Sequence, residues 1–83
     1  MKSAINYIVN KIKREFRVIP HVEDRIFGLE IYWSSYALIL RSNDISFVDY
    51  DHDILDEYDF NTLDELKDIV DEIMDDIGPQ SKQ

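Results

Sequence analysis

The spacing of apolar residues changes twice along this 83-residue chain, and the change limits the folds that it can form. Apolar residues recur at the helical period of about 3.6 over residues 3 to 16 and again over residues 63 to 77. Between these stretches, residues 25 to 33 alternate between apolar and polar, as a half-buried strand requires, and further short apolar runs are separated by polar turns. The sequence therefore predicts an α+β fold: an N-terminal helix, an antiparallel meander of 3–4 strands and a C-terminal helix, with both helices on one sheet face.

The first helix and the segment after it are predicted from capping and proline signals. Ser3 is expected to be the N-cap of a helix that ends at residue 16. Residues 17 to 22 read as a short edge strand, because Pro20 has no N–H to donate to a ladder. Residues 23 and 24, both acidic, are expected to form the next turn.

The longest strand is expected from residue 25 to residue 33, followed by a turn at Ser34 and Ser35. Its alternation places four apolar side chains on one face and two polar ones on the other. The buried face holds Phe27, Leu29, Ile31 and Trp33, and the other face holds Glu30 and Tyr32.

Two further strands, residues 36 to 41 and 45 to 50, are predicted with a polar turn at residues 42 to 44. Residues 54 to 60 also alternate, and a fourth strand and an irregular acidic loop are equally compatible with them. The prediction therefore leaves open whether the meander has three or four strands.

The C-terminal helix is the clearest element. Thr62 and Glu65 have the spacing of a capping box, and Gly78 with Pro79 stops the helix. One domain is expected over residues 1–78, with a disordered tail at residues 79–83. The apolar stripe of this helix comprises Leu63, Leu66, Ile69, Val70, Ile73, Met74 and Ile77.

Negative charge is concentrated in the second half of the chain. From Asp44 to Asp76 there are fourteen carboxylates and a single base, Lys67. Residues 1–43 carry a formal charge of +3, and the remainder carries −12, for a net charge of −9. Such a surface repels nucleic acid and anionic membranes and attracts basic protein grooves.

The helical period gathers these acids on the arc opposite the apolar stripe. Four like-charge pairs at i,i+4 disfavour the helix by about 1 to 2 kcal/mol in total. We expect this arc, extended by the acids before the helix, to bind a partner. The candidate partner-binding residues are Asp49, Asp51, Asp53, Asp56, Glu57, Asp59, Asp64, Glu65, Asp68, Asp71, Glu72, Asp75 and Asp76.

The sequence contains only incomplete versions of known metal-binding or catalytic motifs. Residues 49 to 53 form a DxDxD run like the start of an EF-hand loop, but Ile54 replaces the required glycine and Phe60 the bidentate glutamate. Weak divalent-cation binding there is the remaining alternative. His21 and His52 stand alone, and the chain has no cysteine. No catalytic, cofactor or metal site is expected, and the chain is not expected to be an enzyme.

The leading hypothesis is a small acidic protein that inhibits a nucleic-acid-binding protein, such as a nuclease, a CRISPR-type effector or a repair or restriction enzyme. In size, charge and mixed α/β content it is similar to phage-encoded DNA mimics, such as uracil-DNA glycosylase inhibitors and some anti-CRISPR proteins. The likeness extends to no individual residue. An immunity protein or antitoxin that neutralises a basic nuclease is a related version.

The alternative is a structural module that forms a homodimer through a sheet edge. Direct binding to nucleic acid or to a membrane is not expected at this net charge. Lacking cysteines and a recognisable signal peptide, the chain is expected in the cytoplasm.

Overall fold

The protein is α+β, with two helices and one antiparallel sheet, in a computed structural model that describes residues 2–49, 51 and 53–77. The sheet has five strands, so the expectation of three or four was wrong. The described residues fall into a helical unit (residues 2–19 and 61–77) and a sheet unit (the described part of residues 20–60). A single domain over residues 1–78 stays a prediction, and the tail at residues 79–83 lies outside the described residues.

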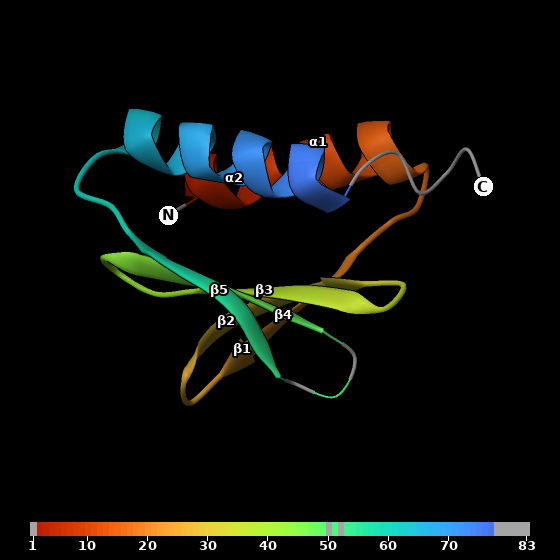
Figure 1. The fold of residues 1–83 in the computed structure, drawn as a ribbon, viewed down its shortest axis with the longest axis horizontal. Coiled ribbons are helices and arrows are strands. Elements are labelled where there is room, and N and C mark those ends of the chain that lie inside the picture. The colour runs from red at the N-terminus through yellow and green to blue at the C-terminus, as the bar shows by residue number, and fades with distance from the viewer. Residues whose placement is uncertain (1, 50, 52, 78–83) are drawn as a thin grey trace. The chain divides into compact units, whose positions relative to one another are not determined.

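The helical unit holds α1 (Lys2–Phe16) and α2 (Leu63–Ile77), which lie side by side and run in the same direction (Figure 1). The capping box of α2 is confirmed. The Glu65 N–H donates to Thr62 Oγ1 at 3.1 Å, and the Thr62 N–H donates to Glu65 Oε1 at 3.1 Å. Ser3 lies within the first turn of α1 instead of capping it, because the helix already includes Lys2. The buried side chains are Ala4, Ile8, Ile12 and Phe16 of α1 and Leu66, Val70, Ile73 and Met74 of α2.

The chain leaves α1 through a left-handed residue, and the edge strand expected over residues 17 to 22 begins only at residue 21. Arg17 has φ 58°, and its N–H donates to the carbonyl oxygen of Lys13 at 3.0 Å. A left-handed residue is a common helix end and does not have the extended backbone of a strand. The first strand, β1, is His21–Arg25, and it contains the residues 23 and 24 that were expected to turn.

The sheet is a five-stranded meander in the order β1-β2-β3-β4-β5, each strand antiparallel to the next. The segment after residue 53, which the sequence left open, forms its last strand. The turn predicted at residues 34 and 35 joins β2 to β3, and Tyr50, the predicted end of a strand, lies outside the described residues. The remaining strands are β2 (Gly28–Trp33), β3 (Tyr36–Leu40), β4 (Asp44–Asp49) and β5 (Ile54–Asp59).

One face of the sheet is apolar, as the alternation predicts. Ile31 lies opposite Leu38 in the register, and Leu40 lies opposite Ile45, and all four side chains are buried. Phe27 was expected on this face but is 48% exposed, because it forms the β1–β2 turn with Ile26.

Gly28 explains where that turn falls. It has φ 142°, and an added Cβ would lie 3.0 Å from the carbonyl oxygen of Leu40. Only glycine fits such a close approach of two strands without a shift of the backbone. The pairing of Arg25 with Gly28 therefore leaves a two-residue loop and shortens the strand expected from residue 25.

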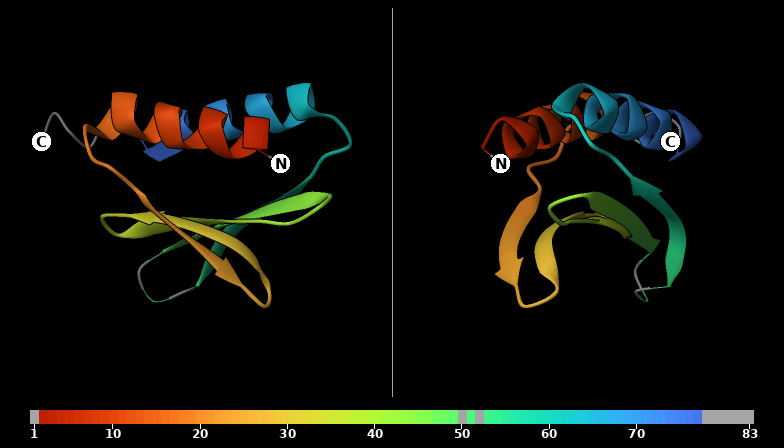
Figure 2. Two further views of the ribbon diagram at one scale, coloured as in Figure 1. Left: turned by 180° about the vertical axis from the view of Figure 1, so that it is seen from behind. Right: turned by 90° about the vertical axis from the view of Figure 1, so that its left-hand side faces the viewer.

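The sheet is curled, with β1 and β5 bending toward the same side (Figure 2). The pairing of β4 with β5 shifts between Phe47 and Val48 and skips Leu55, and such a bulge increases the local bend and twist. Ala37, Ile39 and Val48 form a buried cluster on the concave face, with Tyr32 packed against them.

Candidate functional site

Five of the seven predicted carboxylates on α2 form an exposed row without a neutralising base. They fall within an arc of about 120° at 100° per residue. None of the five makes an ion pair with another residue in the described part of the chain. We call these five the acidic row: Asp64, Asp68, Glu72, Asp75 and Asp76.

Asp71 differs from the row because it faces α1. Its Oδ1 accepts a hydrogen bond of 2.6 Å from the Tyr7 hydroxyl and lies 3.3 Å from Lys11 Nζ. The hydrogen bond to Asp71, followed by burial, raises the pKa of Tyr7 to about 12. Asp71 is half-buried and links the two helices.

Lys67, the only base between Asp44 and Asp76, also lies on the side of α2 that faces α1. Its Nζ sits over the ring of Tyr7, 5.3 Å from the centroid, in a cation–π contact. On the helical wheel it lies about 60° from Asp64, its i,i+3 neighbour, and about 80° or more from the other four members of the acidic row. The one base of this segment is therefore next to Asp64 alone and does not offset the charge of the rest of the row.

Glu65, the remaining predicted acid of α2, serves the helix end. Its Oε1 accepts hydrogen bonds from the N–H groups of Asn61 at 2.7 Å and Thr62 at 3.1 Å. A carboxylate in the first turn also interacts favourably with the helix dipole.

The predicted acids outside α2 lie at the β4–β5 end of the sheet unit. Asp49 Oδ1 accepts hydrogen bonds of 3.0 Å from the N–H groups of Asp51 and Asp53, which closes the loop. Asp51 and Asp53 are exposed. The described residues contain no group of three or more His, Asp or Glu placed to hold a metal ion.

The acids of β5 are exposed along an edge strand, but they do not share a face. Glu57 and Asp59 lie opposite Ser46 and Asp44, whereas Asp56 lies opposite Phe47 on the other side of the sheet. That these residues extend the acidic row stays a prediction.

Carboxylates in the β1–β2 hairpin are treated differently. Glu30, expected to be an outward polar residue, is only 4% exposed, and its Oε1 lies 3.0 Å from Arg25 Nε. Arg25 also pairs with Glu23, which lies directly opposite Glu30 in the register. The hydrogen bond to Glu30 raises the pKa of Arg25.

Tyr32 completes this network. Its hydroxyl donates to Glu23 Oε1 at 3.3 Å, and its ring stacks on His21 with centroids 5.2 Å apart. Burial, followed by the charge of Glu23, raises the pKa of Tyr32. Sequence reasoning missed the network, although Gly28 marks the turn that brings its residues together.

Comparison with known proteins adds no information on the site. Neither helix of the described residues has the length and apolar composition needed to cross a membrane. No protein-family model matches the chain, and no curated protein or solved structure matches it.

Proposed function

We propose that this chain is a small acidic binding protein without enzymatic activity, which inhibits a nucleic-acid-binding protein by presenting carboxylates where phosphates would bind. The observation that carries the proposal is the acidic row on α2, whose only nearby base in sequence is turned onto Tyr7. A row of one sign attracts a basic groove and accelerates association with it.

The spacing of the row supports mimicry of a nucleic-acid backbone. Carboxylates at i,i+3 and i,i+4 have Cβ atoms roughly 5 to 6 Å apart along the helix. This is comparable with the distance between neighbouring phosphates of one strand. A groove shaped for phosphates could therefore bind several of these carboxylates at once.

The row is also unfavourable for the helix that carries it. Asp64 with Asp68, Asp68 with Glu72, and Glu72 with Asp76 are like-charge pairs, each destabilising by about 0.2 to 0.5 kcal/mol. Asp75 and Asp76 lie in the last turn, where the helix dipole favours bases, and that turn has none. A face that only needed to be solvated could include lysines and avoid this cost.

The targets that fit are basic nucleic-acid enzymes: nucleases, CRISPR-type effectors and repair or restriction enzymes. A phage-encoded inhibitor and an immunity protein or antitoxin both fit this role, in the cytoplasm where such enzymes work. We further propose that both helices pack on the apolar sheet face, which would bury the stripes of α1 and α2 together with Ile31 and Leu38.

Affinity capture tests this function. The tagged full chain is incubated with bacterial lysate, and bound proteins are eluted with duplex DNA. We expect a nucleic-acid-binding protein that is released both by DNA and by raised salt, because carboxylates and phosphates would compete for the same bases. Recovery of no such protein, or of one that DNA does not release, would contradict the proposal.

A homodimer through a sheet edge is the second candidate function, and the edge strand β5 favours it. Ile54 is 59% exposed and Leu55 is 47% exposed on this strand, which among the described strands pairs with β4 alone. An open strand edge with apolar side chains can pair with a second copy. Light scattering at high salt distinguishes the two functions, since only the edge dimer would persist there as a particle of twice the mass.

A further inference from the structure

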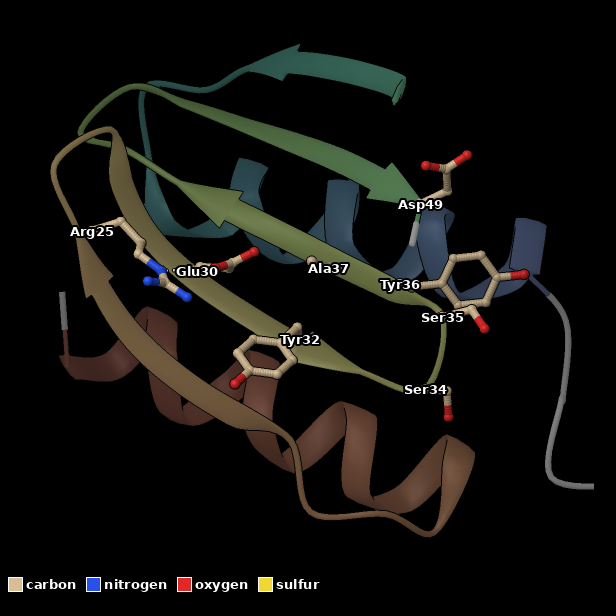
Figure 3. A pocket seen from close by; sticks show the side chains of 8 residues that line it. All are labelled: Arg25, Glu30, Tyr32, Ser34, Ser35, Tyr36, Ala37 and Asp49. Carbon is tan, nitrogen blue, oxygen red and sulfur yellow. Dashed lines mark hydrogen bonds and ion pairs between the residues drawn. The ribbon is translucent and has the colours of Figure 1, made fainter. Parts of the chain in front are cut away.

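A pocket of about 300 Å³ opens on the concave face of the sheet, at the end where the β2–β3 turn lies (Figure 3). We propose that this pocket binds an organic cation of the guanidinium type. Its wall is formed by residues of β1, β2, β3 and β4 and by the β2–β3 turn. The lining residues are Arg25, Glu30, Tyr32, Ser34, Ser35, Tyr36, Ala37 and Asp49.

The charges around the pocket select a cation. Arg25 is the one base in the lining, and its guanidinium is already held by Glu30 and Glu23. Asp49 adds a third carboxylate at the β4 end of the lining, where its Oδ1 also accepts hydrogen bonds from the N–H groups of Asp51 and Asp53. The local sum is therefore negative, and an anionic ligand would compete with two carboxylates for Arg25.

The buried position of Glu30 indicates that this charge has a use beyond folding. Its register partner on β3 is Ile39, and the neighbouring cluster on this face is apolar. Replacing a buried ion pair by apolar residues of similar size is often neutral or stabilising. Because Glu30 lines the pocket, a ligand that pairs with a carboxylate is the use that we infer.

The shape of the pocket fits a flat cation. Ala37 is the small residue on β3 between Tyr32 and Val48, and its short side chain leaves room above the sheet. Tyr32 provides an aromatic ring next to the Glu30 carboxylate (Figure 3). A guanidinium group is planar, stacks on aromatic faces and pairs with carboxylates through two parallel hydrogen bonds.

The turn at the edge of the pocket holds a serine in a backbone conformation that favours glycine. Ser34 is the first of the two turn residues between β2 and β3, and it has φ 48°. A left-handed backbone disfavours any residue with a Cβ, and glycine would adopt it without that penalty. Ser34 and Ser35 line the pocket at this turn, and Figure 3 shows their hydroxyl groups turned outward from Tyr32 and Glu30.

This inference goes beyond the proposed function and does not depend on it. The pocket lies in the sheet unit, whereas the acidic row lies in the helical unit. The same guanidinium chemistry could come from a free small molecule or from an arginine side chain of a protein. The test therefore includes a probe for each source.

Titration of the ¹⁵N-labelled full chain, followed by nuclear magnetic resonance, tests the pocket. N-acetyl-arginine amide represents a protein side chain and agmatine a free small molecule, while N-acetyl-citrulline amide is a neutral control of similar shape. We expect saturable shifts at the amides of Glu30, Tyr32 and Ser35 with at least one of the two cations, and none with the control. The cation that binds more tightly identifies the source.

Variants separate the pocket from diffuse attraction by an acidic protein. Glu30→Gln keeps the shape and an acceptor for Arg25, and Asp49→Asn keeps the Oδ1 that closes the β4–β5 loop. Each is expected to weaken cation binding about tenfold, the effect of losing one charged hydrogen bond. Glu57→Gln removes the same charge outside the pocket, from the sheet face that carries Glu30, and is expected to leave binding unchanged.

The proposal is overturned if neither cation gives saturable shifts or if the citrulline control binds equally well. It is also overturned if Glu57→Gln weakens binding as much as Asp49→Asn does. Amide spectra of the variants show whether each is folded, and Asp49→Asn still decides the question should Glu30→Gln unfold. Variants that remove charges from the acidic row are expected to bind the cation as the wild type does. Failure of the pocket proposal is therefore distinguishable from failure of the proposed function.

Discussion

Carboxylates have opposite surroundings in the β1–β2 hairpin and on helix α2. In the hairpin, Glu23 and Glu30 lie opposite each other, and Arg25 pairs with both. On α2 the acidic row repeats its charge at every turn and receives no base from the described residues. The chain therefore gives the carboxylates of the hairpin a shared base and leaves those of the helix row without one.

The difference follows from burial. Glu30 is almost fully buried, and a buried carboxylate without a partner would destabilise the fold by several kcal/mol. The acidic row is exposed, so each carboxylate is hydrated and the destabilisation is limited to a few tenths of a kcal/mol per pair. Exposure allows an uncompensated row to persist, and we propose that binding to a basic partner is the reason it is kept.

The largest expected effect is on stability, from a substitution in the β1–β2 hairpin. Gly28→Ala places a Cβ 3.0 Å from Leu40 O and 3.1 Å from Arg41 Cγ at a backbone conformation that favours glycine. We expect a loss of about 2 to 3 kcal/mol in the free energy of unfolding, measured with urea. Ser35→Ala, in the neighbouring hairpin turn, is the control and should change it by less than about 0.5 kcal/mol. Equal stability of Gly28→Ala and the wild type would show that the hairpin is not held as described.

Two matched substitutions on α2 compare Asp71, which contacts α1, with Asp75 of the acidic row. Asp71→Asn removes the ion pair with Lys11 and weakens the bond from Tyr7, so it should destabilise by about 1.5 kcal/mol. Asp75→Asn removes the same charge from the acidic row and should be neutral or stabilise by a few tenths of a kcal/mol. Urea unfolding of both variants at low salt measures the difference. Similar losses in the two would contradict the separation of Asp71 from the row.

The pH dependence of the Tyr7 contact gives a smaller effect. The folded-state pKa of Tyr7 is raised from 10 to about 12, so the unfolded chain loses this proton first as pH rises. The contribution of the Tyr7 hydroxyl, about 1 kcal/mol, is thus fully present below pH 10 and is lost between pH 10 and pH 12. Tyr7→Phe should be less stable than the wild type at neutral pH and equally stable near pH 12. A difference between the two proteins that stays constant across this range would rule out the contact.

Local patterns predicted the elements that depend on them. The Thr62–Glu65 capping box is set within a few residues and is present, and the stripe of α2 is buried at Leu66, Val70, Ile73 and Met74, although Leu63 is 39% exposed. Strands β3 and β4 were also predicted, because short apolar runs and polar turns follow one another there, whereas β5 was left open between a strand and a loop.

The errors arose where pairing between distant residues decides the outcome. Phe27 matches the apolar alternation, yet the close approach of Gly28 to Leu40 places the turn at residues 26 and 27. The role of Asp71 depends on Tyr7, which is 64 positions away. No periodicity within α2 distinguishes Asp71 from its acidic neighbours, so the composition of the row could be learned only from the structure.

The central claim is that the acidic row serves binding at the expense of the helix, and one double variant tests both parts. Asp68→Lys with Asp75→Lys replaces three like-charge i,i+4 pairs by opposite-charge pairs and gives the last turn a base. Asp24→Lys with Ser42→Lys and Asn43→Lys changes the net charge equally at exposed positions outside α2 and serves as the control.

The measurement is capture of the DNA-displaceable partner from lysate, with urea unfolding of the same preparations. We predict that the double variant gains about 1 kcal/mol of stability at low salt and no longer retains the partner, whereas the control retains it. Full retention of the partner by the double variant would contradict the account.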